Sequence, residues 1–285
     1  MTGPGTILRE TMRVLLTNDD GLHAEGIQAL RRALLEVPGI ELAVIAPDSN
    51  RSATARSITT RRPIWVEEVD FGDGTVGYAT DGTPVDCVRF AALGLIDGFQ
   101  AELIVSGINH GFNLGDDITY SGTVAAAFEG LVLGIPGIAI SQQSHAREMD
   151  FRPGAVFDFS TAAAFAARVV EEIEDVPLPS GTLLNINVPA GDVDGVEVAR
   201  LGKRIYRDAL KIVEEGATAA RRLYEVYGDS PDYHREDGTD MAAIAEGRIS
   251  VTPLHFDLTD RPGIATLQGY DLAALLEPAV REIEE

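Results

Sequence analysis

Residues 14–22 read Val-Leu-Leu-Thr-Asn-Asp-Asp-Gly-Leu, an apolar run that ends in two adjacent carboxylates and a glycine. The run is short and rich in branched residues, which is typical of a buried parallel β-strand. Ligands of open α/β sheets bind just beyond the carboxyl ends of strands, so Asp19 and Asp20 stand where chemistry is expected. Adjacent strand side chains point to opposite faces, so both can reach one ligand only if the chain turns, which Gly21 permits. Two hard oxygen donors indicate Mg²⁺, Mn²⁺ or Ca²⁺, and a solvated turn is the alternative.

Length and composition restrict the class of protein. A chain of 285 residues with 45% hydrophobic content can bury a large core, as one big domain or one domain with an appendage. No apolar run approaches the roughly 20 residues that cross a bilayer, and residues 1–11 lack the pattern of a secretory signal. The lone Cys87 excludes an internal disulfide framework and thiolate metal clusters. We expect a soluble cytoplasmic protein without a membrane partner.

The charge argues against one class of partner. The formal net charge is −22, whereas a protein that binds a polynucleotide needs a basic stripe. Solvation or adaptation to salt accounts for the acidity. A small phosphorylated substrate would be repelled by this chain unless a cation mediated the contact.

Helical and strand patterns alternate through the first half of the chain. This alternation implies a mostly parallel sheet covered on both faces, an α/β fold of the Rossmann-like three-layer αβα type. Helices are predicted over residues 25–36, 84–95, 124–133 and 155–173, and strands over residues 14–17, 41–46, 103–106 and 137–141.

The second half is less regular. Residues 183–189 and 249–253 predict two more strands, and residues 267–284 predict a terminal amphipathic helix. Residues 202–240 mix charges and tyrosines without periodicity, which indicates an irregular arm or hairpin.

These patterns suggest a division of one structural unit. Residues 12–200 form the predicted catalytic core. Residues 201–285 add the arm, a returning strand and the terminal helix, and residues 1–11 are an N-terminal extension.

Four polar segments lie at the ends of predicted parallel strands, at residues 18–21, 48–53, 106–111 and 141–143. Right-handed crossovers place these ends on one edge of the sheet, so the loops converge on one crevice.

Residues 113–123 lead into a helix whose first N–H groups can cradle a phosphate. Gly122 permits close approach, and the Ser121 and Thr123 hydroxyls can donate further hydrogen bonds. An ordinary N-cap is the alternative role of Ser121, and the two roles can coexist.

This series of motifs resembles the SurE (survival protein E) family. The resemblance runs in the family's order from about residue 12, where family members usually begin, to the carboxyl terminus. The motifs are Asn-Asp-Asp-Gly at 18–21, Ala-Pro-Asp at 46–48, Arg-Ser-Ala-Thr at 51–54, Gly-Thr-Pro at 82–84, Ser-Gly-Ile-Asn at 106–109, Tyr-Ser-Gly-Thr-Val at 120–124, Asn-Ile-Asn-Val-Pro at 185–189 and Val-Thr-Pro-Leu at 251–254.

The resemblance implies a metal-dependent nucleotidase that removes phosphate from nucleoside 5′- or 3′-monophosphates, with polyphosphate trimming in some members. It also implies a divalent cation, Mg²⁺ or Mn²⁺, and a homodimer or homotetramer with exchanged carboxyl-terminal elements. The family's metal ligands map onto Asp19, Asp20, Ser52 and Asn109. This set leaves coordination positions open for water and a phosphate oxygen, as metal-assisted hydrolysis requires.

Roles in catalysis and substrate binding are assigned on the same basis. Asp19 or Asp20 is the candidate general base. The candidate phosphate-binding residues are Asn18, Ser121, Gly122 and Thr123.

The chain departs from the family at Ala55-Arg56, where members often have glycine and histidine. Arg56 could bind phosphate but could not act as a general base, and a simple surface charge is the alternative. His23 and His110 flank the metal loops as polar rim residues or substrate contacts.

Other polar and aromatic residues have two readings. Asn185 and Asn187 face the same side of a strand, for structural hydrogen bonding or substrate contact. Core packing is the more usual role of Trp65, Phe71 and Tyr78, with base stacking as the alternative.

Two other classes remain open. A haloacid-dehalogenase-like phosphatase with an aspartyl nucleophile would need Asp-x-Asp after its first strand, whereas this chain has adjacent carboxylates. A non-enzymatic nucleotide-sensing module is the third hypothesis, although the common glycine-rich dinucleotide and triphosphate loops are absent from the sequence.

Overall fold

The computed structural model describes residues 11–147, 154–206, 210–215, 221–225 and 232–276. The chain divides into two compact units, residues 1–255 and residues 256–285.

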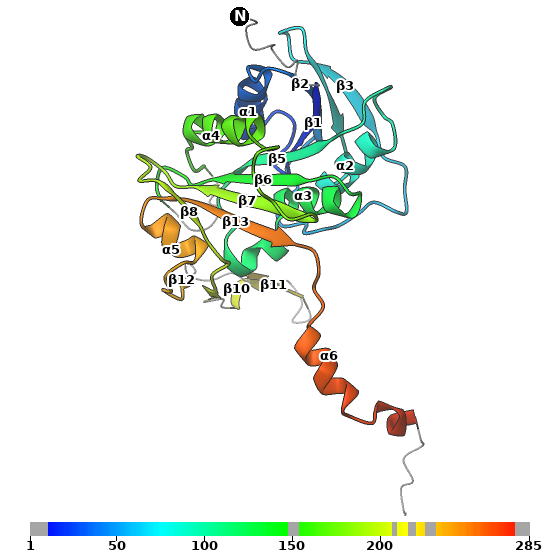
Figure 1. Cartoon of the computed structure of the whole chain (residues 1–285), viewed down its shortest axis with the longest axis vertical. Helices are drawn as coiled ribbons and strands as arrows, with labels where there is room; N and C mark the ends of the chain where they lie inside the picture. Colours follow the sequence, from blue (N-terminus) through cyan, green and yellow to red (C-terminus); the bar gives the residue numbers. More distant parts are fainter. Residues whose placement is uncertain (1–10, 148–153, 207–209, 216–220, 226–231, 277–285) are drawn as a thin grey trace, which may run out of the picture. The chain divides into compact units, whose positions relative to one another are not determined.

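A nine-stranded sheet forms the middle of the first unit (Figure 1). The six strands from β4 to β7 in the sheet are parallel, and β3 and β13 run antiparallel to β4 and β7. The predicted mostly parallel sheet is therefore confirmed. In sheet order, the strands are β3 (Val66–Asp70), β4 (Val76–Thr80), β2 (Ile40–Pro47), β1 (Met12–Thr17), β5 (Leu103–His110), β6 (Gly137–Gln142), β7 (Thr182–Val188), β13 (Ile249–His255) and β8 (Val196–Val198).

The strand order reverses between β1 and β5. The chain leaves β1 toward β2 and β4 on one side, then returns to β5 and continues to β6 and β7 on the other side. In parallel sheets, such a reversal opens a crevice at the carboxyl ends of the two strands where the direction changes. The carboxylates of residues 19 and 20 directly follow β1, and Asn109 lies at the end of β5.

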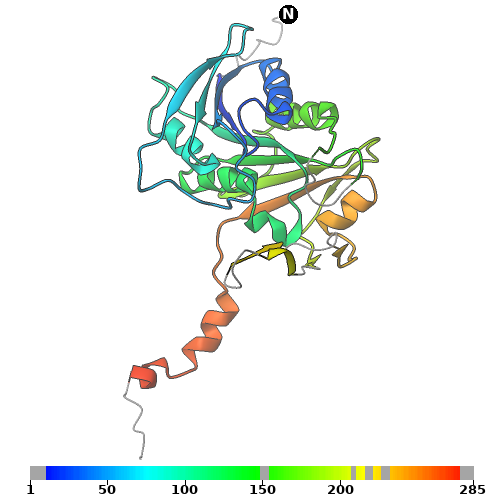
Figure 2. The ribbon, with the colours of Figure 1, turned by 180° about the vertical axis from the view of Figure 1, so that it is seen from behind.

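Helices cover both faces of the sheet. On one face α1 (Glu25–Leu35) packs against α4 (Ser160–Glu171), and on the other α2 (Pro84–Ala92) packs against α3 (Gly122–Val132) (Figures 1 and 2). Successive side chains of β1 point to opposite faces of the sheet, so they pack against different helix layers. Leu16 packs with Leu30 of α1, whereas Leu15 packs with Cys87 of α2. Cys87 is thus a core residue, as predicted.

One crossover has the opposite hand to the others. The connections through α3 and α4 advance in the same direction across the sheet but lie on opposite faces. Since nearly all such crossovers are right-handed, the α4 connection is the exception. The convergence of the strand ends follows from the parallel pairing itself rather than from uniform handedness.

The start of α2 follows a local capping signal. Thr83 and Asp86 form a capping box at α2, with Pro84 at the first turn. The helix predicted over residues 155–173 begins later, at Ser160, which corrects the sequence prediction. The Asp158 carboxylate accepts a hydrogen bond from the Ser160 N–H at 2.9 Å, a local turn that competes with helix formation.

Between β8 and β13, the described residues form two short strand pairs and a helix. The predicted irregular arm contains a hairpin of β10 (Lys211–Glu215) and β11 (Arg222–Glu225), and β9 (Arg204–Ile205) pairs with β12 (Asp232–Tyr233). The helix α5 (Asp240–Ala245) follows, capped by Thr239.

The second unit corrects the predicted terminal helix. It contains α6 (Arg261–Gln268) and a 3₁₀ turn, η2 (Leu272–Leu276). Pro262 in the first turn favours the earlier start, and the helix stops before Gly269. Residues 277–284 of the prediction lie outside the described residues.

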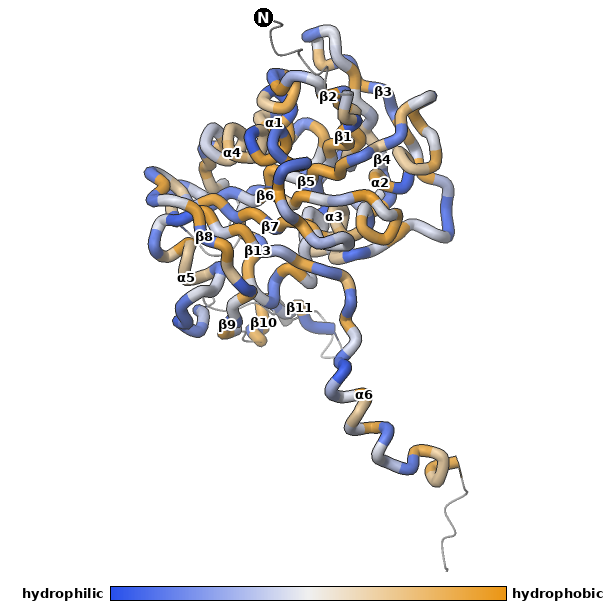
Figure 3. Tube along the Cα trace, viewed as in Figure 1, coloured by the Kyte–Doolittle hydropathy of each residue, from blue (hydrophilic) through white to orange (hydrophobic). Residues whose placement is uncertain are grey.

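Hydrophobic residues concentrate along the central strands (Figure 3). In β7, however, two asparagines are also fully buried, Asn185 and Asn187. Asn187 accepts a hydrogen bond from the Asn113 N–H at 2.8 Å and donates one to the Asn113 carbonyl at 3.0 Å. Asn185 donates to the same carbonyl at 2.8 Å. The two strand asparagines therefore face the same side, as predicted, and they fix the segment that leads to α3.

Replacing Asn187 with alanine should destabilise the fold more than replacing Asn185. Asn187→Ala leaves the buried Asn113 N–H unpaired, which costs about 2 kcal/mol, whereas Asn185→Ala leaves every backbone group of Asn113 with a partner. Urea unfolding of the two variants measures the difference. Equal losses would show that the Asn113 N–H does not depend on Asn187.

Candidate functional site

Asp19 is held against the start of α3. Its two carboxylate oxygens accept hydrogen bonds from the Gly122 N–H, at 3.1 Å, and from the Thr123 hydroxyl. The N-terminal end of a helix carries partial positive charge, which stabilises a carboxylate there. A Cβ on residue 122 would lie 2.7 Å from Asp19 Oδ2, so a glycine is required for this approach.

Asp20 connects two other loops. Its Oδ2 accepts a hydrogen bond from the His110 N–H at 3.0 Å, and its Oδ1 accepts one from the Asn50 side-chain amide at 3.1 Å. The first contact joins the end of β1 to the end of β5. The second joins it to the loop that follows β2.

Asn50 links Asp20 to the backbone of Ser52. The Asn50 side-chain oxygen accepts a hydrogen bond from the Ser52 N–H at 2.9 Å, while its amide nitrogen binds Asp20. The sequence interpretation missed this residue. Its signal is an Asx turn, in which an asparagine side chain accepts from the backbone two residues later.

The site fits a divalent cation through the chemistry of its donors. Asn109 donates its amide nitrogen to the Gly111 carbonyl at 2.8 Å, and this directs the other end of the amide, its oxygen, away from that bond. No group of three or more His, Cys, Asp or Glu side chains suited to a metal occurs among the described residues. The residues that could hold a cation there are Asp19 and Asp20, together with the neutral oxygens of Asn109 and Ser52, and this is a set of hard donors that suits Mg²⁺ or Mn²⁺.

Burial makes the paired carboxylates costly to ionise. Burial, and next the negative charge of Asp20, raises the pKa of Asp19 to about 6. Burial also raises the pKa of Asp20 to about 6. A bound cation would offset both effects, because it compensates the charge that burial and repulsion disfavour.

The predicted phosphate-binding residues surround these carboxylates but already make internal contacts. Asn18 closes the turn after β1, since its side chain donates to the Gly21 carbonyl and accepts from the Gly21 N–H. Ser121 caps α3 by accepting from Val124 N–H at 3.0 Å. The Gly122 N–H and the Thr123 hydroxyl bind Asp19. The expected contacts of all four residues with phosphate stay predictions.

His110 packs against two aromatic rings. Its ring stacks on Phe157 and Phe159, with centroids 5.0 and 4.9 Å away. Its Nε2 accepts a hydrogen bond from the Gly26 N–H at 3.3 Å, and burial lowers its pKa. The side chain is therefore neutral and engaged with α1.

The three aromatic residues considered for base stacking have different surroundings. Tyr78 packs against the core of the α2–α3 face, and Phe71 lies under the Arg31 guanidinium at 4.2 Å. Trp65 is 81% exposed, so core packing is wrong for this residue.

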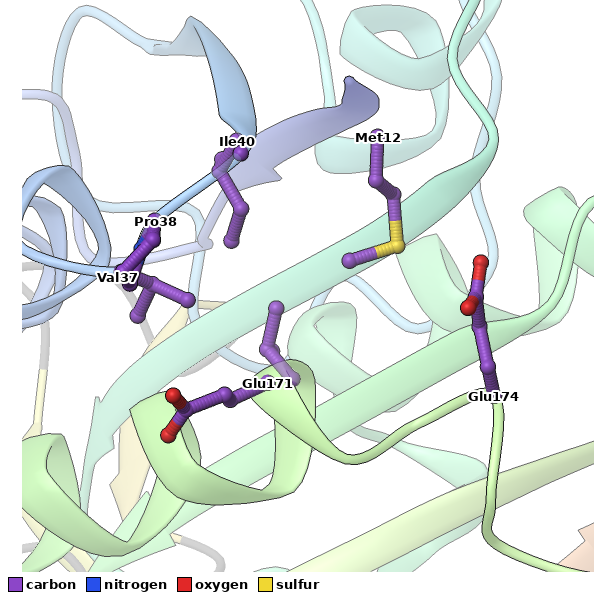
Figure 4. A pocket seen from close by; sticks show the side chains of 8 residues that line it. Met12, Val37, Pro38, Ile40, Glu171 and Glu174 are labelled. Carbon is purple, nitrogen blue, oxygen red and sulfur yellow. The ribbon is translucent and has the colours of Figure 1, made fainter. Parts of the chain in front are cut away.

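A pocket at the amino ends of the central strands is too small for a substrate. It lies beside Met12 and Ile40, the first residues of β1 and β2, and Glu174 also lines it (Figure 4). Its volume of about 10 Å³ holds about one water molecule. The crevice at the carboxyl ends is the candidate active site.

Comparison with known proteins identifies the family. A family model described as Survival protein SurE matches residues 14–208. The chain belongs to the SurE family. A SurE relative from Rubrobacter xylanophilus, named 5′-nucleotidase SurE, is 48% identical over 269 residues, covering 93% of this chain and 99% of the relative. Another from Herpetosiphon aurantiacus, with the same name, is 46% identical over 252 residues, covering 87% of this chain and 94% of the relative.

The fold of a solved SurE protein matches as well. The crystal structure of the Aquifex aeolicus SurE protein superposes with a TM-score of 0.74 at 35% identity, covering 90% of this chain and 98% of that chain. Within the described residues, no helix has the length and apolarity needed to cross a membrane.

The raised pKa values predict that the carboxylate pair destabilises the metal-free protein at neutral pH. A carboxyl whose pKa rises from 3.8 to about 6 on folding binds more protons in the folded state. Its contribution to the free energy of unfolding therefore falls as the pH rises from about 4 to about 6, and it stays low above that range. Asp20→Asn removes one of the two charges. In chelator at pH 7.5, this variant should exceed the wild type in free energy of unfolding by about 1 kcal/mol or more.

Urea unfolding at pH 7.5 and pH 4 measures this difference, which should shrink at the lower pH. Asp97→Asn, at an exposed position, is the control for the change in net charge. A wild type as stable as Asp20→Asn at pH 7.5 would contradict the electrostatic account.

Proposed function

We propose that this chain is a metal-dependent phosphomonoesterase that hydrolyses nucleoside 5′-monophosphates, and also 3′-monophosphates, to nucleoside and phosphate. The observation that carries the proposal is the pair of adjacent carboxylates at the β1–β5 strand reversal, one buried and one half-buried. The His110 N–H, next to Asn109, and the Asn50 side chain, in the loop that carries Ser52, both donate hydrogen bonds to Asp20. The 5′-nucleotidase names of the relatives support the substrate class.

The strong negative charge of the chain makes a cation central to substrate binding. A phosphate dianion approaching a chain of net charge −22 is repelled, and two carboxylates line the crevice itself. Bound Mg²⁺ or Mn²⁺ would supply positive charge for the phosphate oxygens and acidify a water molecule. Asp19, Asp20, Ser52 and Asn109 are the residues proposed to hold it.

Proton transfer is assigned to the same carboxylates. Both oxygens of each carboxylate accept hydrogen bonds, but Asp19 is buried against α3, whereas Asp20 is half-buried at the junction of the β1, β2 and β5 loops. We assign Asp20 as the general base toward the attacking water. Its pKa of about 6 leaves it ionised at neutral pH, as a base requires.

Hydrolysis by water is favoured over a covalent aspartyl intermediate. The haloacid-dehalogenase arrangement separates its two aspartates by one residue, so that both point to the same side. Here Asp19 and Asp20 are adjacent, and their hydrogen bonds lead to different segments, α3 and the β5 end.

Asp20→Asn should lower kcat/KM for a nucleoside monophosphate by about a hundredfold or more, because it removes a proposed ligand and base. The assay measures phosphate released from 5′- and 3′-monophosphates and from short polyphosphate, with Mn²⁺ or Mg²⁺ and with chelator. Asp97→Asn should retain wild-type activity. Turnover that persists in chelator, or in Asp20→Asn at saturating Mn²⁺, would contradict the proposed function.

We also propose that the chain forms a homodimer or a dimer of dimers through its arm. The β10–β11 hairpin exposes apolar side chains, among them Ile212 at 51% and Leu223 at 57%. Exposed apolar groups clustered on a projecting hairpin favour a partner surface, and an identical chain is the simplest partner. Val226 and Tyr227, also expected to contribute, lie outside the described residues.

Light scattering at micromolar concentration should give a multiple of the 30.5 kDa chain mass. Leu223→Asp should shift the particle toward the monomer, because it places a charge in the proposed apolar interface. Leu93→Asp serves as control, since Leu93 is exposed on α2's end rather than on the hairpin. A wild-type mass of 30.5 kDa would contradict the oligomer.

A further inference from the structure

A buried carboxylate in α3 is paired with two arginines. Glu129 is 1% exposed, and its two oxygens lie 2.6 Å from guanidinium nitrogens of Arg56 and Arg89. A carboxylate this deeply buried needs such partners, because an unpaired charge in the interior is strongly disfavoured. From the sequence, Arg56 was expected either to bind phosphate or to be a simple surface charge, and its ion pair with Glu129 fits neither role.

The two arginines belong to different parts of the structure. Arg89 lies in α2, a helix that packs against α3 throughout. Arg56 lies in the loop after β2, four residues beyond Ser52. The pair Arg56–Glu129 therefore ties the Ser52 loop to α3, whereas Arg89–Glu129 ties one helix to its neighbour.

The Ser52 loop adopts a backbone conformation that needs such support. Ala53 and Ala55 have φ angles of 58° and 52°, in the left-handed region that residues with a Cβ rarely adopt. Further contacts fix the loop on either side of Ser52. The Arg51 N–H donates to the Asp19 carbonyl at 2.6 Å, and the Ala55 N–H donates to the Tyr120 carbonyl at 3.1 Å.

The position of Glu129 directs Arg56 away from the phosphate cradle. Glu129 comes seven residues after Gly122 in α3, which corresponds to about 10 Å along the helix axis. Asp19 binds at the first turn of α3, whereas Arg56 binds a residue about two turns further along the helix. This placement suits a tether of the loop better than a ligand of the substrate.

We propose that Arg56 is a positioning residue for the cation site: its ion pair with Glu129 holds the Ser52 loop in the strained conformation that presents Ser52 beside Asp20. The inference rests on the proposed function, in which Ser52 is a metal ligand. Loss of the tether lets the loop relax, so the affinity for the divalent cation falls even though every proposed ligand is still present. Residues that orient ligands typically contribute ten- to a hundredfold in metal affinity.

Two matched variants separate positioning from stability. Arg56→Met and Arg89→Met each remove one guanidinium from the same carboxylate and leave the other in place. Both should lower the melting temperature by a similar amount. They differ in what they release, because Arg56→Met frees the loop and Arg89→Met does not.

The measurement is Mn²⁺ binding to the full-length protein without substrate, followed by the electron paramagnetic resonance signal of free Mn²⁺. Arg56→Met should weaken Mn²⁺ binding by about tenfold or more. Arg89→Met should stay within about twofold of wild type, and Arg56→Lys, which keeps a charge toward Glu129, should restore part of the affinity. Arg56→Gln provides a second neutral variant if Arg56→Met does not fold.

The inference is overturned if the neutral Arg56 variants bind Mn²⁺ like wild type, or if Arg89→Met weakens binding as much as they do. Asp20→Asn distinguishes this failure from that of the proposed function. If Asp20→Asn abolishes Mn²⁺ binding and the Arg56 variants do not weaken it, the positioning role alone fails. If Asp20→Asn binds Mn²⁺ like wild type, the proposed metal site itself fails.

Discussion

Two adjacent carboxylates at the end of β1, one buried and one half-buried, are the constraint on which the rest of the site depends. Burial and mutual repulsion raise the pKa of Asp19, and burial raises that of Asp20. Hydrogen-bond donors from three separate segments offset part of the cost of ionising the two carboxylates. These segments are the start of α3, the end of β5 and the loop after β2. A divalent cation supplies the positive charge that these neutral donors lack, so a site of this kind is better suited to binding a metal than to remaining ionised without one.

The sheet topology makes this assembly possible. The reversal of strand order between β1 and β5 leaves a crevice where no crossover covers the strand ends. The Asp20 contacts join residues separated by 30 and 90 positions in sequence, and the Thr123–Asp19 contact joins residues separated by 104. Buried polar side chains fix the segment that leads to α3. Asn187 and Asn185 bind the backbone of Asn113. The buried Asp240 carboxylate accepts hydrogen bonds from the Gly115 and Gly202 N–H groups. The site therefore depends on contacts made by the core and by the segments after β7.

The sequence predicted features with local signals. The apolar run before Asp19 and the Ser121 cap each lie within a few residues, and the parallel sheet followed from the alternation of patterns. It missed features that arise from contacts between distant segments. Glu129, which pairs with Arg56, lies 73 residues away in the sequence, and Asn50 becomes significant only once Asp20 lies beside it. The opposite hand of the α4 crossover likewise has no local signal in the sequence. The end of α6 before Gly269 was also missed, because the amphipathic pattern of the sequence continues past this residue.

The central claim is that the reversal between β1 and β5 builds one cation site from Asp19, Asp20, Ser52 and Asn109. A crystal of the protein grown with Mn²⁺, measured at a wavelength where manganese scatters anomalously, tests it most directly. The account predicts one strong anomalous peak in the crevice, with oxygens of these residues at about 2.1 Å, the distance typical of small divalent cations bound by oxygen. A peak elsewhere, or one in the crevice that neither Asp19 nor Asp20 contacts, would contradict it.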